Sequence, residues 1–286
     1  MCVMSLRQSM TDAATFVQAE TPVDTSDILR QAVSMKLRAA GWSDRGLVRE
    51  NNEDAFGMIG QEVRRGTRPC YVVCDGLGGA RAGEVASRTA VAAFLDAWRS
   101  ADPAAGTAES LAAAAQSANA AVYQLSLTAR SLEGMGTTLV ALAPHGGRAY
   151  VCNVGDSRCY RVHQGTLALL TQDHTLAAEM VREGLLGATE AAASCWRNTL
   201  TRVVGMQVRE AADVTSHPIE AGDRFLLCSD GVWSAVREAQ VLSTLLACSL
   251  DDAARRLVEL ANEAGGADNA TALVLGVATE DVQAAD

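Results

Sequence analysis

Apolar positions along the first half of the chain alternate between strand spacing and helix spacing. Short apolar or alternating runs at about 39–46, 54–60 and 70–75 predict three strands. The apolar positions of 82–100 recur at helical spacing, and an Ala-rich stretch predicts a second helix over about 107–130. The first block of the sequence therefore pairs a small group of strands with two helices.

The second half of the chain repeats this arrangement. Closely spaced strands, separated by Gly-containing turns, are predicted at about 136–143, 148–154, 157–163 and 166–170. The remaining predicted elements are a helix near 174–186, strands at 213–219 and 223–229, helices at about 237–247 and 250–264, and a strand at 271–278. Segment 186–197 has no clear core face and is predicted to be a surface excursion. Because the hairpin connections are too short for crossovers, the pattern indicates an α+β layered domain with largely antiparallel sheets.

The domain organisation follows from a shift in composition. Residues 1–36 contain polar and acidic stretches with weak periodicity and are predicted to be a flexible tail. Residues 37–280 form the predicted domain, and 281–286 form a short C-terminal tail. At 286 residues and 49% hydrophobic, the chain can bury a sizeable core.

Charge and cysteine usage exclude several classes of protein. The formal net charge of −10 argues against a nucleic-acid partner. Without a run of about 18 apolar residues or a basic leader with an apolar core, a cytoplasmic protein with no membrane partner is expected. The eight cysteines show no CxxC pair or zinc-ligand spacing, so they are interpreted as reduced core residues.

Aspartates stand where apolar strands begin or end. Asp75, Asp156 and Asp230 each follow such a strand, and Asp268 precedes the last one. Any one of these positions is explained equally well by an ordinary Asp-Gly or Gly-Asp-Ser turn. If the strands lie side by side, however, the four carboxylates converge, and their mutual repulsion requires a cation among them.

The donor types indicate which cation would bind. Carboxylates, a backbone carbonyl near a glycine and water favour Mg²⁺ or Mn²⁺ over Zn²⁺. Glu53 and Asp54 open a nearby strand, which gives up to six acids, enough for two ions and a third. Two such ions can activate a shared water for in-line attack on phosphorus. Arg49 is either a bidentate phosphate ligand or a surface ion pair, and the acidic cluster favours the first role.

Other catalytic motifs are incomplete or absent. In "DGLGGAR", Arg81 stands where a GxGxxG fingerprint needs its third glycine, and neither GxxxxGK[ST] nor GxSxG occurs. Of the four histidines, only His174 in "LTQDHT" lies near a motif, and a structural role is the simpler interpretation. Nucleotide-loop and serine-hydrolase chemistry are therefore not expected.

Eight ordered stretches carry a resemblance to a known family. They are "SDRGLVRENNEDAF", "VVCDGLGGARAGEVAS", "GMGTTLV", "NVGDSRCYR", "LTQDHT", "NTLTRVVG", "GDRFLLCSDGVW" and "DNATALVL", and they span residues 43–275. The sequence resembles the metal-dependent Ser/Thr protein phosphatases of the PP2C (PPM) type, in their compact bacterial form. That resemblance implies an αββα sandwich, in which two central antiparallel sheets have helices packed on both outer faces.

The resemblance also implies a metal centre. Asp75 would bridge two Mn²⁺ or Mg²⁺ ions, with the Gly76 carbonyl on one of them. Asp230 and Asp268 would complete the other. The family's nucleophile is a metal-bound water, so no phosphoenzyme is expected.

Further roles are implied for residues around that centre. Glu53 and Asp54 would act directly or through water, and Asp156 would join Asp230 at a third, weaker ion. Arg49 would hold the substrate phosphate. Two residues resemble supporting or packing positions rather than ligands: Asn269 and Thr137.

The sequence departs from the family pattern at positions that bear on the substrate. Leu77 occupies the place of a histidine that eukaryotic members carry, so protonation of the leaving alcohol would fall to water. Ser194 and Cys195 stand where bacterial relatives often have His-Pro in the flap near 174–197, and Arg81 is a further difference. These changes leave the metal ligands intact and concern substrate preference.

The expected function is hydrolysis of phosphoserine and phosphothreonine in phosphorylated proteins, opposing a Ser/Thr kinase. A non-catalytic phosphoprotein-binding module on the same fold is the alternative, and it predicts a broken acidic set. Phosphatase chemistry on a small phosphate ester is a third possibility that the acidic residues alone do not distinguish.

Overall fold

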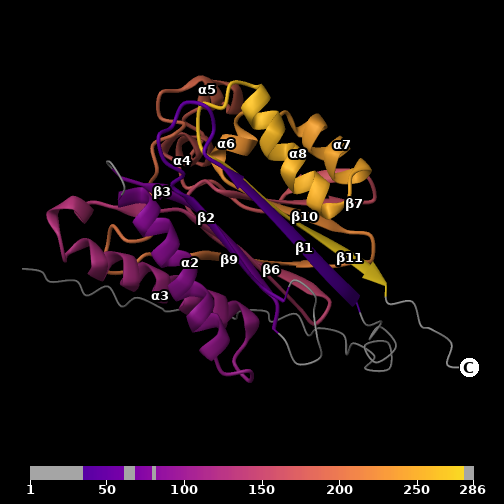
Figure 1. Cartoon of the computed structure of the whole chain (residues 1–286), viewed down its shortest axis with the longest axis horizontal. Coiled ribbons are helices and arrows are strands. Elements are labelled where there is room, and N and C mark those ends of the chain that lie inside the picture. The colour runs from indigo at the N-terminus through magenta and orange to yellow at the C-terminus, as the bar shows by residue number, and fades with distance from the viewer. Residues whose placement is uncertain (1–34, 61–67, 79–81, 280–286) are drawn as a thin grey trace, which may run out of the picture. The chain divides into compact units, whose positions relative to one another are not determined.

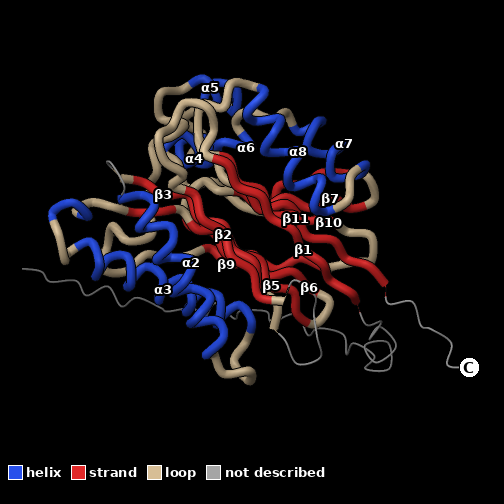
Figure 2. Tube along the Cα trace, in the orientation of Figure 1, coloured by secondary structure: helices blue, strands red, loops and turns tan. Residues whose placement is uncertain are grey.

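Two antiparallel sheets lie face to face at the centre of the protein, and helices cover the outer side of each (Figures 1 and 2). The computed structural model describes residues 35–60, 68–78 and 82–279. The C-terminal tail predicted at 281–286 and all but the last two residues of the N-terminal tail lie outside those residues.

The first sheet joins the two ends of the described chain. Its strand order is β1 (Met35–Asp44), β11 (Ala270–Thr279), β10 (Arg224–Cys228), β7 (Arg158–His163) and β8 (Thr166–Leu169). β1 pairs with β11 along its whole length, and all the pairings in this sheet are antiparallel. The first strand begins at Met35, earlier than the predicted start at about 39, because the alternating "MKLRAAGW" pattern continues the ladder toward the N-terminus.

The second sheet is built from the middle of the chain. Its strand order is β2 (Asp54–Ile59), β3 (Cys70–Leu77), β5 (Leu139–His145), β6 (Arg148–Val154) and β9 (Asp213–Pro218), with β4 (Gly136–Thr137) paired to β3. These pairings are antiparallel too.

The helices divide between the two outer faces. The second sheet is covered by α2 (Ala82–Ser100) and α3 (Thr107–Ser126), and the first by α7 (Glu238–Ala247) and α8 (Leu250–Glu263) (Figure 1). The short helices of the connections are η1 (Arg130–Leu132), α4 (Leu176–Arg182), α5 (Ala188–Ala193) and α6 (Asp230–Trp233). The fold is the expected αββα sandwich of α+β class.

Strand β3 shows why the sandwich needs continuous apolar runs. Tyr71 and Val73 point into the core between the sheets, whereas Cys70, Val72 and Cys74 point outward into the core beneath α2 and α3. All five residues are fully buried. Because successive side chains of a strand face opposite sides, a strand covered on both faces reads as an unbroken apolar stretch rather than an alternating one.

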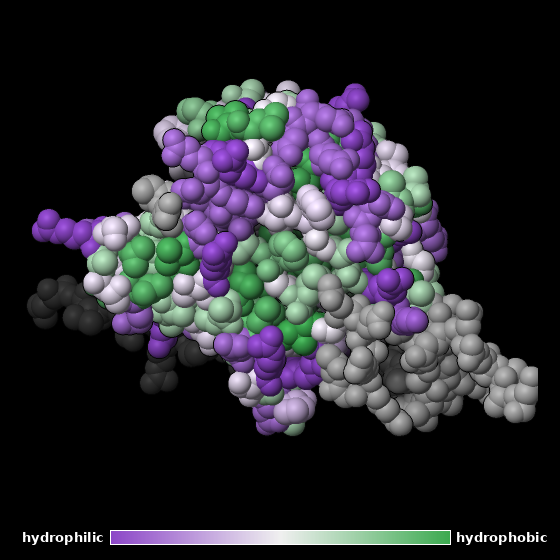
Figure 3. Space-filling view, viewed as in Figure 1, coloured by the Kyte–Doolittle hydropathy of each residue, from purple (hydrophilic) through white to green (hydrophobic). Residues whose placement is uncertain are grey.

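Helix α8 separates one buried face from one charged face. Its buried residues are Ala253, Ala254, Leu257, Val258 and Ala261. Its outer face pairs Arg255 and Arg256 with neighbouring acids, and Figure 3 shows hydrophilic side chains gathered over this helix. This amphipathic pattern explains why a helix was correctly predicted here.

The structure corrects some sequence-based predictions. Segment 186–197 is the surface excursion that was expected, but it also contains the short helix α5, which buries only Ala191 and therefore leaves almost no hydrophobic signal. Five of the seven described cysteines are buried and free, as expected, but Cys195 is exposed and Cys248 is partly exposed. Among the described residues, no helix combines the length and apolar character needed to cross a membrane.

Candidate metal centre

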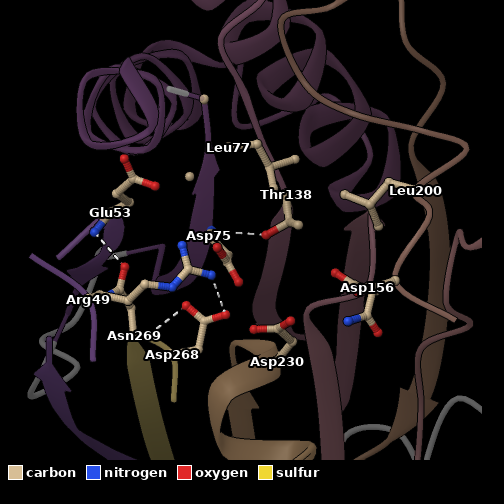
Figure 4. A pocket seen from close by; sticks show the side chains of 13 residues that line it. Arg49, Glu53, Asp75, Leu77, Thr138, Asp156, Leu200, Asp230, Asp268 and Asn269 are labelled. Carbon is tan, nitrogen blue, oxygen red and sulfur yellow. Dashed lines mark hydrogen bonds and ion pairs between the residues drawn. The ribbon is translucent and has the colours of Figure 1, made fainter. Parts of the chain in front are cut away.

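The aspartates at the strand ends meet in one pocket of about 240 Å³, between the ends of the two sheets (Figure 4). The pocket is lined by Arg49, Glu53, Asp75, Gly76, Leu77, Gly78, Thr138, Asp156, Asn198, Leu200, Asp230, Asp268 and Asn269. Of the acidic residues proposed for the site from the sequence, all but Asp54 therefore line the pocket. The prediction that strand ends converge is confirmed by this arrangement.

Asp75 lies at the centre of the pocket, near the end of β3. Its backbone N–H donates to Thr138 Oγ1 at 2.9 Å, and its carbonyl accepts from Thr137 Oγ1 at 2.8 Å. Thr137, predicted to be a supporting residue, is fully buried, and its Oγ1 lies within hydrogen-bonding distance of the Asp75 and Thr138 carbonyls. The two threonines fix the peptide units on either side of the Asp75 side chain.

Asp54 lies behind the pocket rather than in its wall. It pairs across β2 and β3 with Asp75, is only 6% exposed, and accepts a hydrogen bond from Ser229 Oγ at 2.7 Å. Its other carboxylate oxygen is buried and has no partner among the described residues. An unpaired buried carboxylate oxygen is costly, so this atom favours a cation nearby.

Two of the other aspartates come from the first sheet, and the third lies in the turn that joins the two sheets. Asp230 is the first residue of α6, directly after β10, and Asp268 precedes β11. Asp156 lies in the turn between β6 and β7. Asp230, Asp156 and Asp268 all line the pocket with Asp75.

This crowding disfavours the charged forms of the acids. Burial, followed by repulsion from Asp54 and Asp230, raises the pKa of Asp75 well above its ordinary value. Burial also raises the pKa of Asp54 to about 7, and burial with repulsion from Asp230 raises that of Asp156 to about 7. A bound cation would remove these penalties by compensating the negative charge.

Arg49 is the cation nearest the acids in Figure 4. Its Nη2 donates to Asp268 Oδ2 at 2.7 Å, and its side chain remains 49% exposed. Burial lowers the pKa of Arg49, but its ion pair with Asp268 outweighs that effect and raises it. The guanidinium therefore lies at the mouth of the pocket, charged and accessible to an anion.

Glu53 and Gly76 occupy a tightly packed corner of the site. The Gly76 N–H donates to the Glu53 carbonyl at 3.1 Å, and a Cβ on Gly76 would lie 2.6 Å from that carbonyl oxygen. Asn269 holds the neighbouring loop, since its side chain accepts from Glu53 N and donates to the carbonyls of Arg45 and Asn51, each at 2.8 Å. Only glycine at position 76 allows its backbone to pack this closely on the Glu53 carbonyl.

The donor set fits hard divalent cations. Carboxylate oxygens and the Gly76 carbonyl are the ligand types of Mn²⁺ and Mg²⁺. As the side chains lie, no three acidic, histidine or cysteine groups within the described ranges surround a single ion site. The carboxylates that line the pocket and the Gly76 carbonyl are the groups that would hold such ions.

Comparison with known proteins identifies the family. The sequence model of protein phosphatase 2C matches residues 48–272, most of the chain. This chain belongs to the protein phosphatase 2C family. The resemblance inferred from the eight motifs is thus confirmed.

Similar proteins are bacterial Ser/Thr phosphatases. The PP2C-family chain is 38% identical over 252 residues to the Ser/Thr protein phosphatase PstP of Mycobacterium tuberculosis, covering 87% of this chain and 46% of PstP. It is 36% identical over 238 residues to the Ser/Thr phosphatase Stp of Listeria welshimeri, covering 82% of this chain and 93% of Stp. It thus spans less than half the length of PstP but nearly the whole of Stp.

A solved structure supports the same fold. The catalytic domain of PstP, crystallised in complex with two manganese ions, matches with a TM-score of 0.73 and 36% identity, covering 86% of this chain and 100% of that domain. Two main ions, with a third, weaker one, are likewise expected from the sequence of this protein.

The region of the flap contributes to the pocket only in part. Asn198 and Leu200, which follow the flap at 174–197, line the pocket, whereas Ser194 and Cys195 within the flap, where the sequence departs from its bacterial relatives, do not. Leu77 does line the pocket, and Arg81 lies outside the described residues. Sequence reasoning missed Asn198 and Leu200 because neither belongs to a charged motif.

The raised pKa values predict that the metal-free protein gains stability in mild acid. Asp54 and Asp156 have a pKa of about 7 in the folded protein, against about 4 for an exposed aspartate. As the pH falls below 7, the folded state takes up protons before the unfolded chain does, so its stability rises. Each of the two groups gains about 1.5 pKa units of protonation, or about 2 kcal/mol, by pH 5.5. Because 1 kcal/mol corresponds to roughly 2–4 °C, in EDTA we expect Tm at pH 5.5 to exceed Tm at pH 8 by about 10 °C.

Differential scanning fluorimetry across this pH range measures the effect. Excess Mn²⁺ should reverse the trend, because ion binding requires deprotonated carboxylates. A Tm in EDTA that falls steadily from pH 8 to pH 5.5 would contradict the raised pKa values of Asp54 and Asp156.

Proposed function

We propose that this chain is a metal-dependent phosphatase that hydrolyses phosphoserine and phosphothreonine in phosphorylated proteins. The observation that carries the proposal is the convergence of Asp75, Asp156, Asp230 and Asp268 in one pocket, with Arg49 at its mouth. We assign the activity to the domain predicted for residues 37–280, which contains the whole family match at 48–272. The relatives' activity supports this assignment.

Each residue has a distinct role in the proposal. We propose that Asp75 bridges two Mn²⁺ or Mg²⁺ ions and that the Gly76 carbonyl, Asp230 and Asp268 complete their protein ligands. When bound, such ions supply an activated water and neutralise charge on the transferring phosphoryl group. Asp156 provides, with Asp230, a third and weaker ion site.

Three residues support the ligands without lying at the reacting centre. Glu53 acts from the pocket wall through water, whereas Asp54 acts from behind Asp75 as an additional buried negative charge. Asn269 holds the loop that carries Glu53.

Arg49 binds the substrate phosphate. Its guanidinium is anchored by one nitrogen to Asp268, which leaves the other donors free to point at an anion. An arginine can bind two phosphate oxygens in parallel, which orients the phosphorus toward the acids.

The leaving alcohol takes its proton from water. Position 77 is leucine, and the described residues that line the pocket include no histidine. Leu77 and Leu200 instead give the pocket an apolar border that faces the side chain of the phosphorylated residue. The flap near 174–197 is proposed to set substrate preference.

The biological setting follows from this chemistry. We propose that the enzyme acts in the cytoplasm, where it opposes a Ser/Thr kinase that phosphorylates the same proteins.

Turnover assays test the proposed function directly. The purified full chain is expected to hydrolyse p-nitrophenyl phosphate and a phosphothreonine peptide with Mn²⁺ and to lose both activities in EDTA. A phosphotyrosine peptide of the same sequence is the matched control and should be a poor substrate. Absence of Mn²⁺-dependent turnover would refute the proposal, and activity on the aryl ester alone would indicate a small-molecule phosphatase.

A further inference from the structure

The turn that carries Asp156 is held at three successive residues. Gly155 N–H donates to His174 Nδ1 at 3.1 Å, the Asp156 carbonyl accepts from Trp233 Nε1 at 2.9 Å, and Ser157 Oγ lies 2.7 Å from Thr138 Oγ1. Each partner comes from a different part of the chain. Residues 155–157 are all buried.

His174 is itself fixed by a charged network. It is fully buried, and because its Nδ1 accepts from Gly155, its Nε2 carries the proton and donates to Asp213 Oδ2 at 3.0 Å. Arg202 Nη1 binds the other oxygen of Asp213 at 2.7 Å. The imidazole therefore has one tautomer and one orientation.

Trp233 connects Asp156 to Asp230. It is the last residue of the single-turn helix α6, whose first residue is Asp230. The Arg158 guanidinium lies 3.7 Å from the centre of the Trp233 ring and makes two hydrogen bonds to Asp173, at 3.0 and 2.7 Å. The ring is thus held on its face while its N–H holds the Asp156 carbonyl.

Thr138 connects the same turn to Asp75. Its Oγ1 accepts from Asp75 N–H and pairs with Ser157 Oγ. Gly155 adopts φ +98°, and a Cβ there would lie 2.7 Å from Thr138 Cγ2. Only glycine allows the turn to pack this closely on Thr138.

The Asp156 carboxylate depends on these backbone contacts. Within the described part of the chain, no other side chain is hydrogen-bonded to its oxygens, which face the pocket. Its position is therefore set by the peptide units at Gly155 and Asp156. Fixing those units fixes the carboxylate.

We infer that His174 and Trp233 are positioning residues that hold Asp156 at the geometry needed for the weaker ion site. This inference rests on the proposed function only in taking Asp156 as an ion ligand. Neither residue lines the pocket, so each acts through the Gly155–Asp156 backbone. Partners outside the ligand set typically change metal affinity by about 10–100-fold.

Substitutions can separate the two contacts of His174. In His174→Asn the amide oxygen lies near the position of Nδ1 and still accepts from Gly155, but the side chain is too short for Asp213. In His174→Gln the amide nitrogen lies near Nε2 and still reaches Asp213, but the Gly155 acceptor is lost. If His174 positions Asp156, the asparagine variant should retain more affinity at the weaker site.

Trp233→Phe has a matched control in the same protein. It removes the N–H but keeps a ring against Arg158. Trp98 makes the same pair of interactions far from the acids: its Nε1 donates to the Arg68 carbonyl at 3.1 Å, and the Arg68 guanidinium lies 4.3 Å from its ring centre. Trp98→Phe therefore removes an equivalent hydrogen bond without touching the Asp156 turn.

Calorimetric titration of the full chain with Mn²⁺, without substrate, tests the inference. Asp156→Asn should remove the weaker class of sites. Trp233→Phe and His174→Gln should weaken it by about 10-fold and leave the tight class unchanged, whereas Trp98→Phe should change neither class. Circular dichroism and Tm confirm folding, and if His174→Gln does not fold, the two tryptophan variants decide alone.

Unchanged weak-site affinity in Trp233→Phe would overturn the inference, as would equal weakening in Trp98→Phe. A wild-type titration with no weaker class, or with one that Asp156→Asn leaves intact, would also overturn it. Failure of the proposed function is a separate result: the protein would bind Mn²⁺ with these variant effects but release no phosphate from the phosphothreonine peptide.

Discussion

Replacing Asp75 with asparagine should lower Mn²⁺-dependent turnover by about 10³-fold or more, since residues outside a ligand set are already worth 10–100-fold in metal affinity or activity. Asp75 lies centrally among the pocket acids and is the proposed bridge between two ions. An amide has the same shape as the carboxylate but carries no charge. Phosphate release from the phosphothreonine peptide, measured over a range of Mn²⁺ concentrations, gives kcat and KM for both proteins.

The same variant should affect stability in the opposite direction. In EDTA, Asp75→Asn removes one of several repelling buried charges, so its Tm should equal or exceed that of the wild type. The stabilisation that Mn²⁺ gives to the wild type should be lost, because a ligand stabilises only the folded state that binds it. This combination separates a functional role from simple damage to the fold.

Asp96→Asn is the control for Asp75→Asn. Asp96 is exposed on α2, and within the described part of the chain its side chain pairs only with Arg99. Its replacement should leave turnover and the Mn²⁺ effect on Tm unchanged. Full activity of Asp75→Asn would be incompatible with the proposed centre.

Removing the Arg49 side chain should lower kcat/KM for the phosphopeptide by about 10²–10³-fold, the usual effect of losing one group that stabilises charge in a transition state. Arg49→Lys should fall between Arg49→Ala and the wild type, because lysine keeps the charge but cannot bind two phosphate oxygens in parallel. Steady-state kinetics with the same peptide measures both variants.

Metal binding distinguishes this role from that of the acids. Because Arg49 pairs with Asp268, its removal leaves that carboxylate free, and Mn²⁺ affinity should stay the same or increase. Arg45→Ala is the control, since Arg45 is an exposed arginine nearby whose side chain, among the described residues, hydrogen-bonds only the Glu50 carbonyl. Weaker Mn²⁺ binding by Arg49→Ala, or an equal loss of activity in Arg45→Ala, would count against a phosphate-binding role.

The strand-end aspartates could be predicted because each follows or precedes a strongly apolar strand. Asp75 and Asp230 are visible as polar endings of buried runs, and the structure places both in the pocket. Their convergence depended on assuming that the strands lie side by side. The acids do converge, but β3 and β10 are not side by side: they belong to the two sheets that face each other, and their ends meet at the pocket.

Residues that act through the backbone could not be found in this way. Thr138 is one polar residue in an apolar run, and its importance depends on a hydrogen bond to Asp75, which lies in another strand. Trp233 reaches the Asp156 carbonyl only because β10 and β7 are neighbours in the sheet. Such long-range pairings are not encoded in local periodicity.

Asp54, in contrast, was predicted at the site but does not line the pocket. In sequence it is equivalent to Glu53, and both were expected at the ions. Because side chains alternate along a strand, the two point to different places: Glu53 lines the pocket, whereas Asp54 is buried against Ser229. The boundary of β2, which begins at Asp54, decides this difference.

The pairing of β1 with β11 has a consequence for the order of events during synthesis. The ribosome produces β1 first, yet its only partner in the sheet is the last described strand, and Asp268 emerges just before that strand. A nascent chain that ends just after α6 therefore has Asp75, Asp156 and Asp230 but neither a complete first sheet nor a complete acidic set. Since domains fold as units during translation, the growing polypeptide cannot assemble the acidic pocket until almost the whole domain has left the exit tunnel.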